Sequence, residues 1–335
     1  MEVVKQRNDR ADNIKAILIF LVVFGHMLEL ASARRIYLII YSFHMPAFIF
    51  VTGYYAKFKP RKILLELIMP YILFQTLYLL FDGYINGEPV TLQYTKPYWL
   101  MWYLLTIIIY YLLLPLIRTD NKKQRRMIFI LSVAISLLAG YDTSIGYYMS
   151  LSRTLVFLPF FVLGNYIGNN RPCKIVFEKW HQKAAILFGT VISSYYILTA
   201  EVSSAMLYGS YSYEGAGFGL MKRAVLLIIA WVWILALFNF VPNTEIPVFR
   251  VWGKGTFSVF LIHGFIQRLI GKGDFFDSNS RSKYISAAFV SVLVVMLFGN
   301  RYVSKAFDYV ARGRALRENK DRSTARMAFC TKKTT

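Results

Sequence analysis

Long apolar runs alternate with short polar segments along most of the chain. Each run has roughly 18 to 25 residues, the length that an α-helix needs to cross a bilayer. The pattern predicts an all-α fold, a polytopic integral membrane helix bundle with about ten transmembrane helices. The predicted spans are residues 13–33, 36–56, 63–82, 98–117, 127–142, 150–169, 184–201, 221–241, 254–272 and 284–307.

The first run, residues 12–29, carries polar side chains along one stripe of an otherwise apolar helix. Steps of three and four residues return to the same helical face, and they align Asp12, Lys15, His26 and Glu29. Ionisable groups are costly in hydrocarbon, so this stripe is expected to face a protein interior or a wet cavity. A histidine satisfied by a neighbouring helix is the structural alternative. The charged pair three turns before His26 favours a functional role.

Composition and charge fit a membrane protein. Of the 335 residues, 56% are hydrophobic and 17% are charged, against about 25% charged in ordinary globular domains. The net charge of +21 is attributed to loops, because Lys and Arg collect on the cytoplasmic side of membrane proteins. No nucleic-acid partner is expected. Short basic loops such as KFKPRK and RTDNKKQRR alternate with longer, less basic ones, which predicts that both termini are cytoplasmic.

Three segments are predicted: a cytoplasmic amino-terminal segment (1–12), a transmembrane domain (13–311) and a basic cytoplasmic tail (312–335). The tail has too few large apolar residues to pack and is expected to be disordered or attracted to anionic lipid. No cleavable signal peptide is expected, since the first run lacks a small-residue cleavage site. Cys173 and Cys330 have no metal-ligand spacing, so neither a disulfide nor a zinc site is expected.

Three of the four histidines lie within predicted spans: His26, His44 and His263. With a rise of about 1.5 Å per residue, His26 and His44 both come out about 10–12 Å below the outer surface. Their spans are joined by a short connection, so the two side chains are expected to share one cavity. His263 lies near the middle of its span. His181 sits in the basic segment KWHQK and is expected to be solvated.

Basic and aromatic residues suggest where ligands would bind. An anion arriving from the cytoplasm would meet Lys15, with Arg10 and Lys254 as helpers, although a lysine there also suits snorkelling to the interface. Arg153 begins the sixth span and either binds substrate or anchors the helix. The outer loops are rich in Tyr, Gly and Ser, which suits carbohydrate stacking and, equally, an interfacial aromatic belt. Trp99, Trp102 and Tyr103 fit packing in that belt.

Several catalytic motifs are absent from the sequence: the P-loop, the G-x-S-x-G elbow, H-E-x-x-H and the dinucleotide fingerprint. Three stretches instead resemble the membrane-bound acyltransferase-3 family, in particular its fucose 4-O-acetylase-like branch. They are RADNIKAILIFLVVFGH, SFHMPAFIFVTGYY and WGKGTFSVFLIH. The resemblance covers residues 10 to about 307. One departure is Lys15, where many members have Arg, because Lys cannot make the planar bidentate contact of Arg. No soluble extension like that of some relatives is expected.

The resemblance implies an O-acetyltransferase of the bacterial plasma membrane. The family moves an acyl group, usually acetyl, from cytoplasmic coenzyme A to a hydroxyl of an envelope or capsular polysaccharide sugar or its lipid-linked precursor. The expected partners are acetyl-CoA, a sugar acceptor and the bilayer, with no metal. His26 would be the general base, and His44 would orient the acceptor or polarise the carbonyl. The other expected site residues are Arg10, Asp12, Lys15 and Lys254 for the donor, and Arg153, Trp99, Tyr103 and His263 for the acceptor.

Two other functions fit the residues. A transporter or flippase of envelope sugars would use the intramembrane histidines as a proton relay. A structural subunit would use them for stability alone. Transfer of labelled acetyl from acetyl-CoA to glycan separates the enzyme from both alternatives. The acceptor sugar and the oligomeric state are left open.

Overall fold

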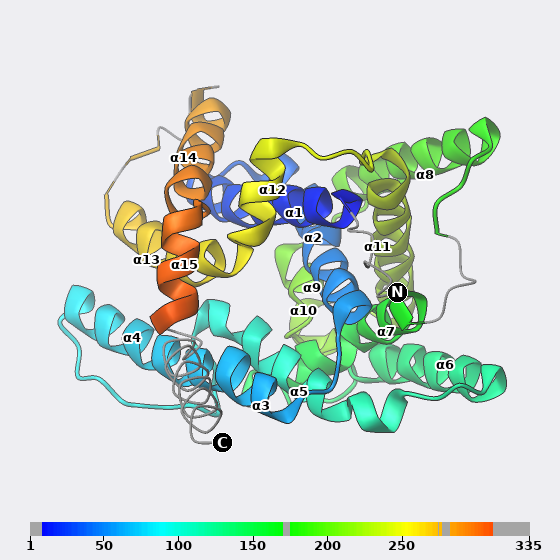
Figure 1. Ribbon diagram of the computed structural model, residues 1–335, viewed down its shortest axis with the longest axis horizontal. Coiled ribbons are helices and arrows are strands. Elements are labelled where there is room, and N and C mark those ends of the chain that lie inside the picture. Colours follow the sequence, from blue (N-terminus) through cyan, green and yellow to red (C-terminus); the bar gives the residue numbers. More distant parts are fainter. Residues whose placement is uncertain (1–8, 170–174, 274, 277–281, 311–335) are drawn as a thin grey trace, which may run out of the picture.

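The computed structural model describes residues 9–169, 175–273, 275–276 and 282–310, and all the regular structure in these residues is helical (Figure 1). The all-α prediction is therefore confirmed. The α-helices are α1 Asp9–Leu30, α2 Arg34–Tyr55, α3 Pro60–Ile63, α4 Met69–Asn86, α5 Trp102–Ile117, α6 Lys122–Leu138, α7 Leu151–Asn169, α8 Trp180–Thr199, α9 Ser204–Tyr208, α10 Tyr213–Ala216, α11 Leu220–Phe240, α12 Pro247–Lys254, α13 Thr256–Gly271, α14 Ser282–Phe298 and α15 Arg301–Val310. Short helices of other types are η1 Leu64–Ile68, η2 Trp99–Met101 and η3 Tyr148–Ser150.

Six described helices are long and apolar enough to cross a bilayer, or seven if the bent pair α14 and α15 is one span. The chain is thus a multi-pass membrane protein. Each of the ten predicted runs contains a helix, but α6, α8 and α13 fall short in length or apolarity. The number ten stays a prediction. The last run bends by 61° because Asn300 starts a new helix there, its side chain accepting from the backbone N–H groups of Tyr302 and Val303.

Helix α1 is a core helix of the bundle. It packs against α2, α12, α13 and α14, and Figure 1 shows it among them. Residues around its whole circumference are fully buried, including Ile14, Leu18, Ile19 and Val23. The polar residues Asn13 and His26 of α1 are therefore buried among these helices, whereas Glu29 near its end is exposed.

Helix α2 is held against α7 through glycines. At Gly53 and Gly164 an added methyl group would overlap the facing backbone carbonyls of Phe161 and Phe50. Small residues allow membrane helices to approach this closely. α2 also packs against α11, so the helix that carries His44 is fixed on two sides.

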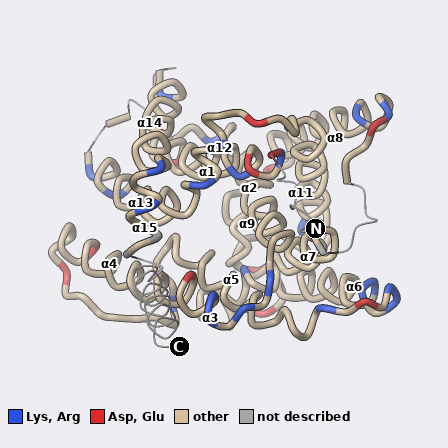
Figure 2. Tube along the Cα trace, viewed as in Figure 1, with Lys and Arg blue, Asp and Glu red and all other residues tan. Residues whose placement is uncertain are grey.

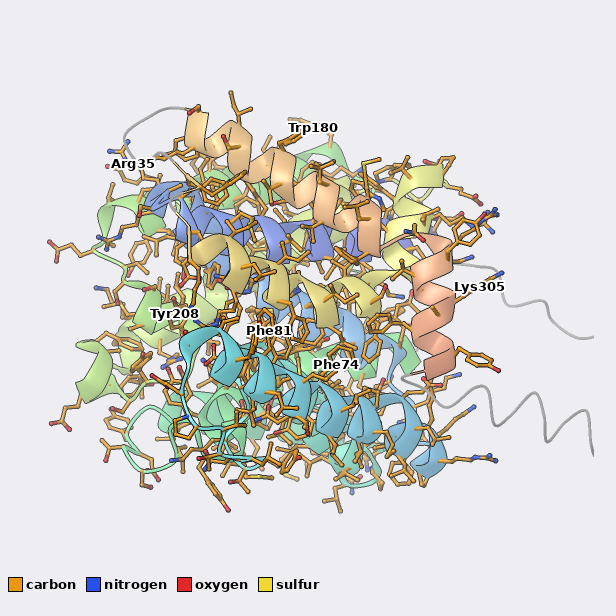
Figure 3. The ribbon with its side chains drawn as sticks, turned by 90° about the vertical axis from the view of Figure 1, so that its left-hand side faces the viewer. Arg35, Phe74, Phe81, Trp180, Tyr208 and Lys305 are labelled. Atoms are coloured by element: carbon orange, nitrogen blue, oxygen red, sulfur yellow. The ribbon has the colours of Figure 1, made fainter. Side chains whose placement is uncertain are left out.

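Charged residues gather at helix ends, while the helix bodies are mostly uncharged (Figure 2). The basic start of α6 is one example, where the Asn121 side chain accepts from the N–H groups of Lys123 and Gln124. Arg35 and Tyr208 lie at one end of the bundle and Lys305 at the other (Figure 3). Which end is cytoplasmic stays a prediction, as do the three segment boundaries. The tail over 312–335, Cys173 and Cys330 lie outside the described residues.

Candidate active site

His26 sits near the carboxy-terminal end of α1 and is only 7% exposed. Its Nδ1 lies 2.9 Å from the Tyr41 hydroxyl and 3.5 Å from a carboxylate oxygen of Glu29. Glu29 follows by three residues on the same helical face, and Tyr41 reaches in from α2. Gly25 makes room, since a methyl group there would stand 2.9 Å from the Tyr41 ring. His26 is therefore held by a hydroxyl and a carboxylate.

The other two histidines of the predicted spans gather around the same point. The His263 ring stacks on His26 with centroids 5.4 Å apart, and Trp99 packs against His26 at 4.6 Å. The Tyr41 ring lies 4.7 Å from His44 and 6.0 Å from His26. Segments from α1, α2, α13 and η2, which are far apart in sequence, thus meet at His26.

His44 and His263 share a hydrogen-bonding pattern that His26 lacks. Their Nδ1 atoms lie 2.8 Å from the Ile40 carbonyl and 2.9 Å from the Val259 carbonyl. A carbonyl can only accept, so Nδ1 carries the proton and the neutral ring presents Nε2 as an acceptor. The Nε2 of His263 is buried and has no partner among the described residues. A buried polar atom in that state marks a place for a ligand or a water molecule.

A cavity of about 290 Å³ approaches these histidines from the amino-terminal half of α1. It ends one helical turn from each: Val22 precedes His26, Phe260 precedes His263 and Phe48 follows His44. Two cations, Lys15 and Lys254, lie on an otherwise mainly apolar and aromatic wall, and we call this the Lys15 cavity. The remaining lining residues are Met45, Val51, Thr52, Tyr55, Leu67, Tyr103, Leu104, Ile107, Tyr111, Gly253, Thr256 and Phe257.

Two of the four residues expected to bind the donor, Lys15 and Lys254, line the cavity. Lys15 lies 4.3 Å from the centre of the Tyr55 ring and 3.5 Å from Asp12, and Lys254 lines the same cavity. Asp12 is not part of the cavity wall but pairs with Lys15 beside it. Arg10 is not on that wall either, and its Nε donates to the Val241 carbonyl.

Arg153 lies in a cluster of aromatic side chains at the Glu29 end of the bundle. Its guanidinium lies 4.9 Å from the Trp102 ring and 5.1 Å from the Tyr147 ring. It donates to the Tyr208 carbonyl and the Ser210 hydroxyl, both at 3.3 Å. Tyrosines that were expected near sugar therefore meet around one cation. We call Arg153, Trp102, Tyr147, Tyr208, Ser210 and Tyr211 the Arg153 cluster.

The four residues expected to bind the acceptor lie at three places. Trp99 and His263 pack against His26, Arg153 lies in its cluster, and Tyr103 lines the Lys15 cavity, bonded to Thr52 at 2.7 Å. Tyr103 therefore lies on the same cavity wall as Lys15 and Lys254.

Two partners of His26 were not among the expected site residues: Glu29 and Tyr41. The Tyr208 hydroxyl lies 3.4 Å from Glu29, which connects the carboxylate to the Arg153 cluster. The spacing of Glu29 three residues after His26 was a usable signal. Nothing in the sequence pointed to Tyr41.

A family model described as an acyltransferase domain matches residues 8–300. The chain belongs to the membrane acyltransferase-3 family. The expected family and enzyme class are thereby confirmed, whereas the fucose 4-O-acetylase-like branch stays a prediction. A search of curated proteins and a search of solved structures each found no match.

Acyl transfer needs a base that can reach the attacking hydroxyl and a channel that admits an acyl donor. In this acyltransferase the described bonds of His26 use Nδ1, so Nε2 is left to accept a proton. The three histidines thus lie within one cluster, in which the described bonds of each ring use Nδ1. In the described part of the chain, no three His, Cys, Asp or Glu residues are grouped as a metal site would need.

Proposed function

We propose that this membrane acyltransferase moves an acetyl group from cytoplasmic acetyl-CoA to a hydroxyl of an envelope or capsular polysaccharide sugar, or of its lipid-linked precursor. The bacterial plasma membrane is the proposed location. The observation that carries the proposal is the cavity that runs from Lys15 and Lys254 to within one turn of His26. A thioester and a buried base would meet at the end of the cavity nearest His26.

The wall of the Lys15 cavity suits acetyl-CoA. Lys15 and Lys254 would attract the phosphates of the donor as point charges, with Asp12 holding Lys15 and Arg10 adding positive charge nearby. The apolar and aromatic residues beyond them suit the uncharged arm and the acetyl group. Tyr103, with its hydroxyl on this wall, would contact the acyl end of the donor.

His26 is proposed as the general base. As the acceptor oxygen attacks the thioester carbonyl carbon, Nε2 takes the hydroxyl proton, and Glu29 stabilises the imidazolium that forms. The carbon–sulfur bond then breaks, and the thiolate of coenzyme A takes that proton back from His26. The products are an acetyl ester and free coenzyme A, so atoms and charge balance.

The remaining residues are proposed to position the acceptor. His263 and His44 present Nε2 as fixed acceptors, which suits hydroxyl groups. Polarising the thioester carbonyl would instead need a proton on Nε2, so the orienting role is the one proposed for His44. Trp99 forms a flat wall beside His26, on which a sugar ring would stack. Arg153 and its tyrosines would bind the next part of the glycan.

The test is transfer of labelled acetyl from acetyl-CoA to glycan by membranes that contain the protein, with the product identified by mass spectrometry. His26→Ala should insert and fold yet lose transfer, while His181→Ala, exposed at the start of α8, should keep it. Retained transfer in His26→Ala would reject the base assignment. No transfer by the unaltered protein would reject the proposed donor and acceptor.

A further inference from the structure

A second cavity, of about 250 Å³, lies between the carboxy-terminal ends of α1, α4 and α13. It shares no lining residue with the Lys15 cavity. Its wall is largely polar, in contrast with the apolar wall of the first. The lining residues are Leu30, Ile85, Asn86, Gln267, Arg268, Gly271 and Lys272, and we call it the Arg268 cavity.

The two cavities approach the histidine pair from opposite directions along the same two helices. On α1, Val22 lines the first cavity and Leu30 the second, each four residues from His26. On α13, Phe260 lines the first cavity and lies three residues before His263, while Gln267 lines the second and lies four residues after it. Residues three and four apart share one helical face. The stacked imidazoles therefore lie between the two cavities.

Gln267 gives the Arg268 cavity a polar side chain. The residue is only 7% exposed and lies one turn beyond His263 on α13. None of the hydrogen bonds among the described residues involves its amide, which lines the cavity. Neither amide atom is among the fully buried side-chain atoms that lack a partner, so both are accessible, and together they offer a donor and an acceptor. That pair of groups suits a sugar hydroxyl.

The charges at the Arg268 cavity are net positive. Arg268 and Lys272 are cations on its wall, and Asp82, 3.4 Å from the Arg268 guanidinium, is the nearby carboxylate. Arg268 also lies 6.0 Å from the Trp99 ring, which contacts His26 at 4.6 Å. A ligand that paired with Arg268 would thus sit beside the aromatic wall of the proposed base.

We propose that the Arg268 cavity admits the acceptor, and that the acceptor is an acidic sugar whose carboxylate or phosphate pairs with Arg268 and Lys272. Gln267 bonds a ring hydroxyl, and a neighbouring hydroxyl reaches His26 past Trp99. The inference rests on the proposed acetyl transfer and deepens it by assigning a charge to the acceptor. The Arg153 cluster, on the Tyr41 side of His26, then holds an adjoining part of the glycan.

The test measures sugar binding and needs no turnover. The full chain in lipid nanodiscs is titrated by calorimetry with glucuronate, glucose 1-phosphate and glucose. The acidic sugars should bind about tenfold more tightly than glucose, because charge-assisted bonds are roughly twice as strong as neutral ones. Tighter binding of glucuronate indicates a carboxylate-bearing glycan. Tighter binding of glucose 1-phosphate indicates a phosphate-linked precursor.

Variants separate the contribution of the two cations to sugar binding from that of the Gln267 amide. Arg268→Gln and Lys272→Gln should each remove most of the preference for acidic sugars, while Arg268→Lys should keep part of it. Gln267→Leu should weaken the binding of glucose and the binding of glucuronate to the same extent. Arg35→Gln is the matched control, since Arg35 is exposed at the Tyr208 end of the bundle (Figure 3) and outside both cavities. Lys272→Gln keeps the test decisive if loss of the Asp82 pair unfolds Arg268→Gln, because Lys272 is exposed.

Three results would overturn the inference: equal affinity for acidic and neutral sugars, no binding of any of them, or a charge preference that stays undiminished in Lys272→Gln and, where it folds, in Arg268→Gln. The proposed function fails separately. Selective binding without acetyl transfer to any glycan would reject the transfer and leave the cavity as an acidic-sugar site. Acetyl transfer to a neutral glycan, without any preference for acidic sugars in binding, would support the transfer and reject the acidic-sugar site.

Discussion

The rings of His26 and His263 stack with their centroids 5.4 Å apart, and both residues are buried. They are nevertheless held by different kinds of hydrogen bond. His263 uses Nδ1 on the carbonyl of the preceding turn, as His44 does on α2. His26 instead places Nδ1 between a tyrosine hydroxyl and a carboxylate. The pair therefore contains one imidazole tied to the backbone and one tied to side chains.

This difference separates two chemical roles. A backbone carbonyl fixes one tautomer and one orientation, but it carries no charge that would stabilise an imidazolium. A carboxylate does carry that charge, as in the triads where an acid orients and supports a catalytic histidine. His26 is thus suited to gain and lose a proton within one turnover. His263 and His44 are suited to present a fixed acceptor nitrogen.

The largest predicted effect compares the two stacked rings directly. His26→Gln should lower the turnover number for acetyl transfer by about 10²–10⁴, the usual contribution of a positioned base. His263→Gln keeps a polar group at the second ring and should cost about tenfold or less, as expected for a lost orienting hydrogen bond. Both are measured as kcat with purified protein in nanodiscs. Equal losses, or a larger loss for His263→Gln, would contradict the division of roles.

The next effect concerns the carboxylate that distinguishes His26. Glu29→Gln keeps the shape but removes the charge, and kcat should fall by roughly ten- to a hundredfold, which is less than in deeply buried triads because Glu29 is partly exposed. The KM for acetyl-CoA should not change, since Glu29 lies outside the Lys15 cavity. Glu214→Gln, exposed in α10, is the control. An unchanged kcat would mean that the carboxylate only packs against the Tyr208 hydroxyl.

Part of this comparison could be predicted from the sequence. The period of the apolar runs located a helix at each expected position, and the polar stripe of α1 located His26. The bonds that distinguish the histidines could not be predicted, because they depend on how α1, α2 and α13 are rotated against one another. That rotation is set by contacts such as Gly25 against Tyr41. For the same reason the sequence did not show that Trp99 packs against His26 whereas Tyr103 lines the Lys15 cavity.

A smaller effect tests whether the Lys15 cavity serves the donor alone. Lys15→Gln and Lys254→Gln should each raise the KM for acetyl-CoA about fivefold, because a partly exposed charge contact contributes about 1 kcal/mol at most. The kcat should stay constant, since both lysines are remote from the histidines. Added salt should shrink the difference from the unaltered protein. Lys122→Gln, exposed at the start of α6, controls for net charge.

An outcome in which the lysine variants lower kcat, or weaken acceptor binding instead, would contradict that assignment. It would also weaken the comparison between the histidines, because the cavity that reaches to within one turn of both residues would then hold both substrates. The acceptor titration of the same variants distinguishes the two cases.

The last prediction, of similar size, separates the two partners of His26. Tyr41→Phe removes the hydroxyl 2.9 Å from Nδ1 but leaves the ring against His44. A single neutral hydrogen bond contributes about 0.5–1.5 kcal/mol, so kcat should fall by about two- to tenfold, less than in Glu29→Gln. A larger loss in Tyr41→Phe than in Glu29→Gln would show that the hydroxyl, and not the carboxylate, supports the base. His26 would then resemble its two neutral neighbours, and the proton would need another charged partner on its way to the thiolate.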